Sequence, residues 1–184
     1  MQTIDKSGII CDYCGLTNTS DFIYYSFDFR AIQVNNNHIP NLEMILNTGI
    51  VVSYDICMSC YTQLSQKVVD NYKKIKPKQG AKRNSSHCEL TGNVLTGTYD
   101  YYYCVVTKVN VHTTGQPNVC VDCQKTTLDV DKPCQCGSVN FVRPALINTT
   151  KRFLEFSVCE EVIQTFRKKA ETVRARPSQW TTDT

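Results

Sequence analysis

The spacing of apolar residues changes from a strand pattern to a helix pattern in both halves of the chain. Residues 22–33 (FIYYSFDFRAIQ) and 50–55 (IVVSYD) are rich in aromatic and β-branched side chains, which favours two strands. Turn residues lie between them, with three asparagines at 35–37 and Asn-Thr-Gly at 47–49. The sequence therefore predicts a β-hairpin.

A helix is predicted directly after this hairpin. From residue 60 onward, apolar side chains recur at intervals of three or four residues, which places them on one face of a helix. This stripe consists of Cys60, Leu64, Val68, Tyr72 and Ile75.

The second half of the chain repeats these signals. Residues 99–111 (YDYYYCVVTKVNV) carry the clearest strand signal of the sequence. Together, the two halves predict a small α+β protein. The second helical stripe follows Cys159 and consists of Val162, Ile163, Phe166, Ala170 and Val173.

Two Cys-x-x-Cys pairs flank the first hairpin. Cys11 and Cys14 precede it, and Cys57 and Cys60 stand where strand gives way to helix. Four cysteines in two such pairs suit a tetrahedral zinc ion and leave no ligand position open for water or substrate, which is typical of structural sites. Gly15 directly follows the first pair, and a tight turn around a metal needs one residue with positive φ.

This order of cysteine knuckle, hairpin and helix resembles the treble-clef zinc fingers. The resemblance covers residues 11–75 and rests on the four cysteines and the elements expected between and after them. It implies a structural zinc ion and a helix whose first turn carries the second ligand pair.

A second complete metal signature lies in the second half. Cys120 and Cys123 are followed, after ten residues, by Cys134, Cys136 and then Gly137. Two cysteine pairs joined by a short loop resemble the knuckles of a zinc ribbon, with the second pair spaced more tightly than usual. We therefore expect two Zn²⁺ ions per chain.

The sequence on either side of this insert looks like a worn copy of the first unit. The frame CELTG from Cys88 matches CDYCG from Cys11, and FSVCEEV around Cys159 matches YDICMSC. Thr91 and Val162 stand where each pair has its second cysteine. We interpret this as an internal repeat of two treble-clef-like zinc units, the second carrying the inserted ribbon.

Three cysteines remain outside the two zinc signatures. One hypothesis is a third metal site that uses Cys88 and Cys159 with His87 or Cys104. The other is that Cys88, Cys104 and Cys159 are buried free thiols that act as small apolar side chains. We favour the second, because each copied pair lacks one cysteine and Cys104 lies inside a strand.

Local composition predicts a linker between the two units and a tail after the second. The segment between the two units contains Pro and Gly and no apolar side chain larger than that of Ala81, which is typical of a solvated linker. After the second unit, Trp180 is the main side chain with surface to pack. The expected segments are residues 1–76 (first unit), 77–86 (basic linker), 87–176 (second unit, with the ribbon at 120–136) and 177–184 (tail).

Cysteine usage indicates the compartment. The chain has 184 residues and eleven cysteines, eight of them in close pairs, and neither a leader nor a membrane-spanning run is expected. Metal thiolates are favoured over disulfides, and with them a reducing compartment, either cytoplasm or nucleus. A redox role for Cys57 and Cys60 is disfavoured, because it would leave Cys11 and Cys14 without partners.

Positive charge is concentrated in two stretches. The formal net charge is +3, yet residues 61–87 hold seven basic residues against one acidic residue, a balance of +6. Residues 150–176 hold seven against four, a balance of +3. The first stretch is a candidate phosphate-binding surface, with a solvated helix end as the alternative. Its candidate nucleic-acid-binding residues are Lys73, Lys74, Lys76, Lys78, Lys82 and Arg83.

No catalytic set of residues is found in the sequence. Treble clefs include His-Asn-His nucleases, but the first hairpin offers only His38 and its helix only Asn71. We expect a non-enzymatic zinc-binding protein that contacts nucleic acid or a nucleoprotein complex, as a transcription or processing factor does. The alternative is a structural subunit or adaptor of a large protein assembly. Neither a membrane nor a small-molecule substrate is expected as a partner.

Overall fold

The computed structural model of the chain describes residues 9–18, 22–34, 42–74, 87–94, 99–112, 117–127, 129–142 and 146–175. The strands of the main body are β3 (Phe22–Val34), β4 (Val52–Cys57), β5 (Tyr99–His112) and β9 (Leu146–Cys159). Its helices are α1 (Leu42–Asn47), α2 (Met58–Lys74) and α3 (Glu160–Arg174).

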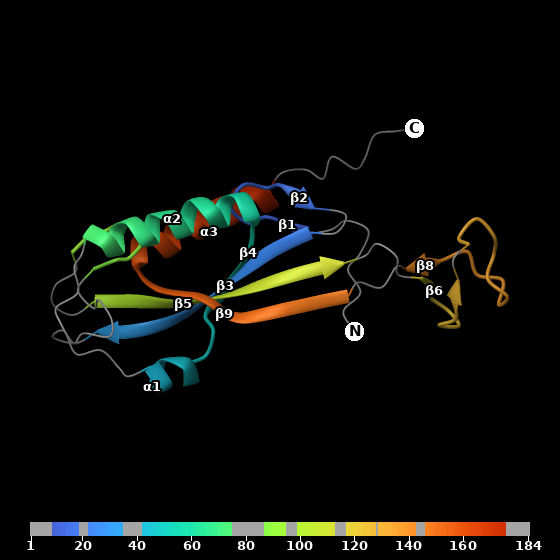
Figure 1. Ribbon diagram of the computed structural model, residues 1–184, viewed down its shortest axis with the longest axis horizontal. Helices are drawn as coiled ribbons and strands as arrows, with labels where there is room; N and C mark the ends of the chain where they lie inside the picture. The colour runs from blue at the N-terminus through green and yellow to red at the C-terminus, as the bar shows by residue number, and fades with distance from the viewer. Residues whose placement is uncertain are drawn as a thin grey trace.

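The four strands form one antiparallel sheet in the order β4–β3–β5–β9. Figure 1 shows α2 and α3 side by side on one face of this sheet and the short helix α1 on the other face. The predicted hairpin is confirmed, because β3 pairs with β4 from Tyr24–Cys57 to Phe29–Val52. The α+β class is confirmed as well. Helix α1, between the two strands, was not predicted.

Both long helices begin where a strand ends. Helix α2 follows the last residue of β4, and α3 follows the last residue of β9. The predicted stripe of α2 is buried at Cys60, Leu64 and Val68, whereas Tyr72 is 56% exposed. The stripe's last member, Ile75, lies outside the described residues. The stripe of α3 is buried at Val162, Ile163, Phe166 and Ala170.

The core between sheet and helices draws on both halves of the chain. Phe27 of β3 lies 5.8 Å from Phe156 of β9 and 6.0 Å from Phe166 of α3, measured between ring centroids. All three rings are almost fully buried, and each such side chain contributes about 1.5–3 kcal/mol to folding. The first and second halves are therefore held together by one shared core.

Two small sheets carry the cysteine knuckles. Strands β1 (Ile9–Ile10) and β2 (Thr17–Asn18) form a hairpin around the first knuckle. Strands β6 (Asn118–Cys120), β7 (Thr126–Thr127) and β8 (Phe141–Val142) form a separate sheet, hereafter the ribbon. Figure 1 shows the ribbon beyond one end of the main sheet.

Two predicted segments fall outside the described residues. These are the linker at 77–86 and the tail at 177–184 with Trp180. The boundaries proposed for the two units stay predictions. Across the described parts of the chain, no helix has both the length and the apolar composition that crossing a bilayer requires.

Candidate metal centres

The first predicted metal site brings four cysteines together from two ends of the first half. Cys11 and Cys14 lie on the turn between β1 and β2, while Cys57 ends β4 and Cys60 lies in the first turn of α2. All four Sγ atoms lie within 4.8 Å of one another, and those of Cys14 and Cys57 are 3.7 Å apart. Tetrahedral zinc with Zn–S bonds of about 2.3 Å requires sulfurs about 3.8 Å apart. These residues, the first tetrad, fit such an ion.

Backbone hydrogen bonds shape the first knuckle. The amide of Cys11 donates to the carbonyl of Leu16 at 2.8 Å, and the amide of Gly15 donates to the carbonyl of Cys11 at 2.8 Å. Gly15 has φ of +80°, which a residue without Cβ adopts freely. The amide of Cys57 donates to the Cys11 sulfur at 3.2 Å and so orients that ligand.

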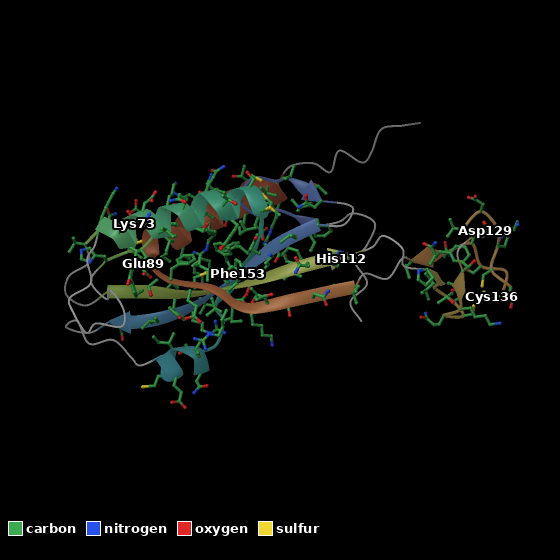
Figure 2. All side chains as sticks on the ribbon, in the orientation of Figure 1. Lys73, Glu89, His112, Asp129, Cys136 and Phe153 are labelled. Atoms are coloured by element: carbon green, nitrogen blue, oxygen red, sulfur yellow. The ribbon has the colours of Figure 1, made fainter. Side chains whose placement is uncertain are left out.

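The second tetrad gathers in the ribbon. The sulfurs of Cys120 and Cys136 are 3.5 Å apart, those of Cys123 and Cys134 are 3.4 Å apart, and all four lie within 4.8 Å of one another. Figure 2 shows Cys136 within this small unit, away from the main sheet. The tight Cys134–Cys136 spacing therefore still closes a four-sulfur site.

Each half of the ribbon site has its own turn. The amide of Gln124 donates to the carbonyl of Cys120 at 3.0 Å, and that of Gly137 donates to the carbonyl of Cys134 at 2.7 Å. Both turns need a left-handed residue, with φ of +60° at Gln124 and +86° at Gly137. Gln124 thus occupies, in the ribbon, the place that Gly15 has in the first knuckle.

Burial and hydrogen bonds shift the pKa values of the thiols within each tetrad in different directions. Burial raises the pKa of Cys60, and the neighbouring thiols raise it further. Burial opposes ionisation of Cys14 too, but hydrogen bonds from the Leu16 backbone and the other thiols lower its pKa overall. In the ribbon, a hydrogen bond from the backbone of Cys123 lowers the pKa of Cys120 to about 6.

The fourth ribbon thiol behaves in the opposite way. The Ser138 backbone hydrogen bond favours ionisation of Cys136, but interactions with the other thiols raise its pKa to about 12. In each tetrad, the negative charge of one thiolate therefore makes the neighbouring thiols harder to ionise. A bound cation removes this repulsion. None of the eleven cysteines forms a disulfide. Four free thiols around one point are consistent with zinc, which would stabilise the fold at both sites.

The remaining thiols do not complete a third site. The amide of Cys159 donates to the Cys88 sulfur at 3.4 Å, so these two cysteines are together. Their neighbours at the other two ligand positions are Thr91 and Val162. Cys104 is fully buried on β5, and burial holds its pKa well above the usual value. Among the described residues, three or more potential metal ligands gather only in the two tetrads.

The predicted basic residues are described only in part. Lys73 and Lys74 lie exposed in the last turn of α2, whereas Lys76, Lys78, Lys82 and Arg83 lie outside the described residues. Two cations of α3 contact the first knuckle. Arg174 lies 3.5 Å from the Asp12 carboxylate, and Lys169 lies 4.3 Å from the centre of the Tyr13 ring.

One important contact was missed by sequence reasoning. In the sequence Asn71 is only a weak nuclease signal, yet its Nδ2 donates to the carbonyls of Glu89 at 3.1 Å and Leu90 at 2.9 Å. It therefore clamps the turn after Cys88 onto α2. A single asparagine on a helix surface carries no local signal for such a contact. His38, the other nuclease candidate, lies outside the described residues.

Comparisons with protein-family models, curated proteins and solved structures return no match to this chain. The class of this protein is therefore described from its fold and its cysteine groups alone. It is a small α+β protein with two four-cysteine groups that can each hold a metal ion.

Proposed function

We propose that this protein is a non-catalytic, zinc-scaffolded binding protein of the treble-clef type, and that its partner is nucleic acid or a nucleoprotein complex, as for a transcription or processing factor. Four thiolates saturate a tetrahedral zinc ion, so neither tetrad offers a position for substrate. The ions would act by holding knuckle, strand and helix together.

The end of α2 carries this proposal. Lys67, Lys73 and Lys74 are exposed, and the described residues offer them no hydrogen-bonding or ion-pair partner. Figure 2 shows Lys73 at the end of α2, and Lys76 and Lys78 follow it in the sequence. Two cations of α3, Lys169 and Arg174, by contrast contact the first knuckle. Exposed lysines that lie along one segment and have no ion-pair partner are suited to bind successive phosphates of a nucleic-acid backbone.

A salt titration tests the proposal. If about five phosphates of duplex DNA are bound, log K should fall against log salt with a slope of about −4 to −5. Replacing Lys73, Lys74, Lys76 and Lys78 with glutamine should flatten the slope by about one unit for each phosphate that is no longer neutralised, and should weaken binding to all sequences alike.

A matched control carries the same change of charge elsewhere. In it, Lys125, Lys132, Lys151 and Lys168 are replaced with glutamine. The control should bind nearly as the native chain does. Equal weakening in both variants, or no binding of duplex and single-stranded probes near physiological salt, would overturn the proposal.

A second candidate function is that of an adaptor in a protein assembly, which the surface of the ribbon favours. Val121, Val130 and Val139 of the ribbon are 46%, 47% and 70% exposed. The described ribbon residues contain two lysines and three aspartates, so this surface is not basic. Exposed valines on a surface without an excess of positive charge suit a protein partner. Val139→Ser should weaken such a complex without changing its salt dependence.

A further inference from the structure

The turn after Cys88 repeats the first knuckle in detail. The same distance along the chain separates Cys11 from Cys88 and Gly15 from Gly92, and the two glycines have φ of +80° and +77°. The Gly92 amide donates to the Cys88 carbonyl at 2.8 Å, as the Gly15 amide does to Cys11. The second turn is therefore folded like a metal knuckle although Thr91 replaces its second cysteine.

The contacts between each knuckle and its following strand are repeated as well. Asp12 donates its amide to the carbonyl of Asp55 at 2.8 Å, and Glu89 donates its amide to the carbonyl of Ser157 at 2.9 Å. The return bonds also match, since the side-chain carboxylates of Asp12 and Glu89 accept from the amides of those same partners. The amide-to-sulfur bond from Cys57 to Cys11 has its copy from Cys159 to Cys88.

The pairing of β3 with β5 relates the two halves by symmetry. The spacing that relates the knuckles makes Tyr99 the counterpart of Phe22 and Val111 the counterpart of Val34. Phe22 pairs with Val111, and Val34 pairs with Tyr99. Asp28 pairs with Val105, its own counterpart. A two-fold axis therefore passes through the sheet between these last two residues.

The same two-fold axis relates helix α2 to helix α3. Figure 1 shows α2 and α3 side by side and running in opposite directions. Each knuckle is held by the helix of the other half: Asn71 of α2 binds the carbonyl of Leu90, and Lys169 of α3 covers the ring of Tyr13. Tyr13 and Leu90 occupy the same position of the two knuckles, two residues after Cys11 and Cys88. The knuckle of each half therefore contacts the helix of the other half, and the arrangement is symmetric.

We infer that the two halves are copies of one metal-binding unit arranged about this internal two-fold axis, and that the second copy keeps a preformed third metal position that lacks only two donors, at Thr91 and Val162. The ligand class of the restored position is a thiophilic divalent cation in tetrahedral coordination. This inference does not depend on the partner proposed above.

The two missing donors match their counterparts in exposure. Thr91 is exposed, as Cys14 is, and Val162 is buried, as Cys60 is. Both positions lie on the same elements as in the first half, in the knuckle and in the first turn of a helix. A sulfur at each position would complete, with Cys88 and Cys159, the four corners seen in the first tetrad.

The double variant Thr91→Cys/Val162→Cys of the full chain tests the inference. After loading the reduced protein with Co²⁺, the native chain should bind two ions and the double variant three. The visible absorption of tetrahedral cobalt thiolate should rise about 1.5-fold, because three four-sulfur centres replace two. Val162→Cys removes little volume, so the variant should fold.

Two further variants keep the test decisive. Thr91→Cys alone leaves the core untouched and should bind a third Co²⁺ more weakly, through three thiols. Thr165→Cys/Thr172→Cys adds two thiols to the exposed face of α3 and should still bind two ions. The inference is overturned if the Thr91 variants bind only two ions while folded, or if the control variant binds three.

Discussion

The two halves of the main body share one backbone design but not one chemistry. Each half has a knuckle, a long strand, a second strand paired with the sheet and a helix that follows it directly. The hydrogen bonds of the two knuckles agree within a few tenths of an ångström. Only the first half has four thiols. Glycine and backbone hydrogen bonds thus maintain the knuckle geometry where no metal site exists.

Apolar packing and a clamp replace the metal in the second half. Phe166 takes the place on α3 that Leu64 has on α2, and its ring lies 5.5 Å from Phe29 and 5.3 Å from Tyr13. Asn71 adds two hydrogen bonds to the second knuckle. One backbone design thus has a four-thiol group that can hold a metal ion in one copy and depends on side-chain packing in the other.

The largest difference between the halves should appear when equivalent cysteines are changed. Cys57→Ser removes a ligand of the first tetrad, and structural zinc contributes about 10 kcal/mol in small fingers, comparable to the total stability of a domain. We expect this variant to lose one zinc equivalent and the cooperative unfolding of the main body, as followed by circular dichroism.

Cys159→Ser, the equivalent change in the second half, should be milder. It places a hydroxyl where a thiol is buried, which costs about 1–3 kcal/mol. Zinc content should stay at the native value, and unfolding in urea should remain cooperative. Equal loss of metal and stability in both cysteine variants would contradict the difference between the halves.

A moderate effect is expected from the clamp of the second knuckle. Asn71→Ala removes two hydrogen bonds and leaves two backbone carbonyls unpaired, so stability should fall by about 1–2 kcal/mol. Gly92→Ala should act on the same contact, because φ is +77° there and an added Cβ would lie 3.1 Å from the Asn71 side chain.

Gln66→Ala serves as the control for this clamp. Gln66 lies on the same helix and its side chain donates to the exposed Asp70. Its removal should change the urea midpoint little. If it destabilises the protein as much as Asn71→Ala does, the clamp carries no special role.

The smallest effect extends the comparison to the ribbon knuckle. Gln124 has φ of +60° at the position where the other knuckles have glycine, and a side chain in this region costs about 1 kcal/mol or more. Gln124→Gly should therefore stabilise the zinc-loaded ribbon by about that amount. Amide hydrogen exchange of the ribbon measures this, and faster exchange in the variant would count against the equivalence of the three knuckles.

The sequence was informative where the signals are local. Cysteine spacing identified both tetrads, and apolar periodicity located β3, β5 and the two long helices. Pairing of β3 with β5 joins segments that are distant in sequence. In β3 the buried Tyr25, Phe27 and Phe29 alternate with polar residues, whereas β5 buries consecutive side chains from Tyr103 to Val106. Neither pattern identifies the strand with which it pairs. The pairing of the halves had to come from the structure.

The role of the basic residues of α3 could not be predicted from the sequence for a related reason. The basic residues of α3 resemble a solvated surface in sequence, but Arg174 and Lys169 meet Asp12 and Tyr13, which lie at the opposite end of the chain. The role of Asn71 depends on a similar long-range contact. Side chains of this kind receive their function from tertiary neighbours, which local patterns do not reveal.

The central claim is that the chain holds two metal centres, of which the first half of the body has one and the second half, outside its ribbon, has none. The most direct test is the metal content of the reduced native protein, measured by elemental analysis after dialysis into metal-free buffer. The account predicts two zinc ions per chain. One ion or none would contradict the two tetrads, and three would contradict the loss of donors at Thr91 and Val162.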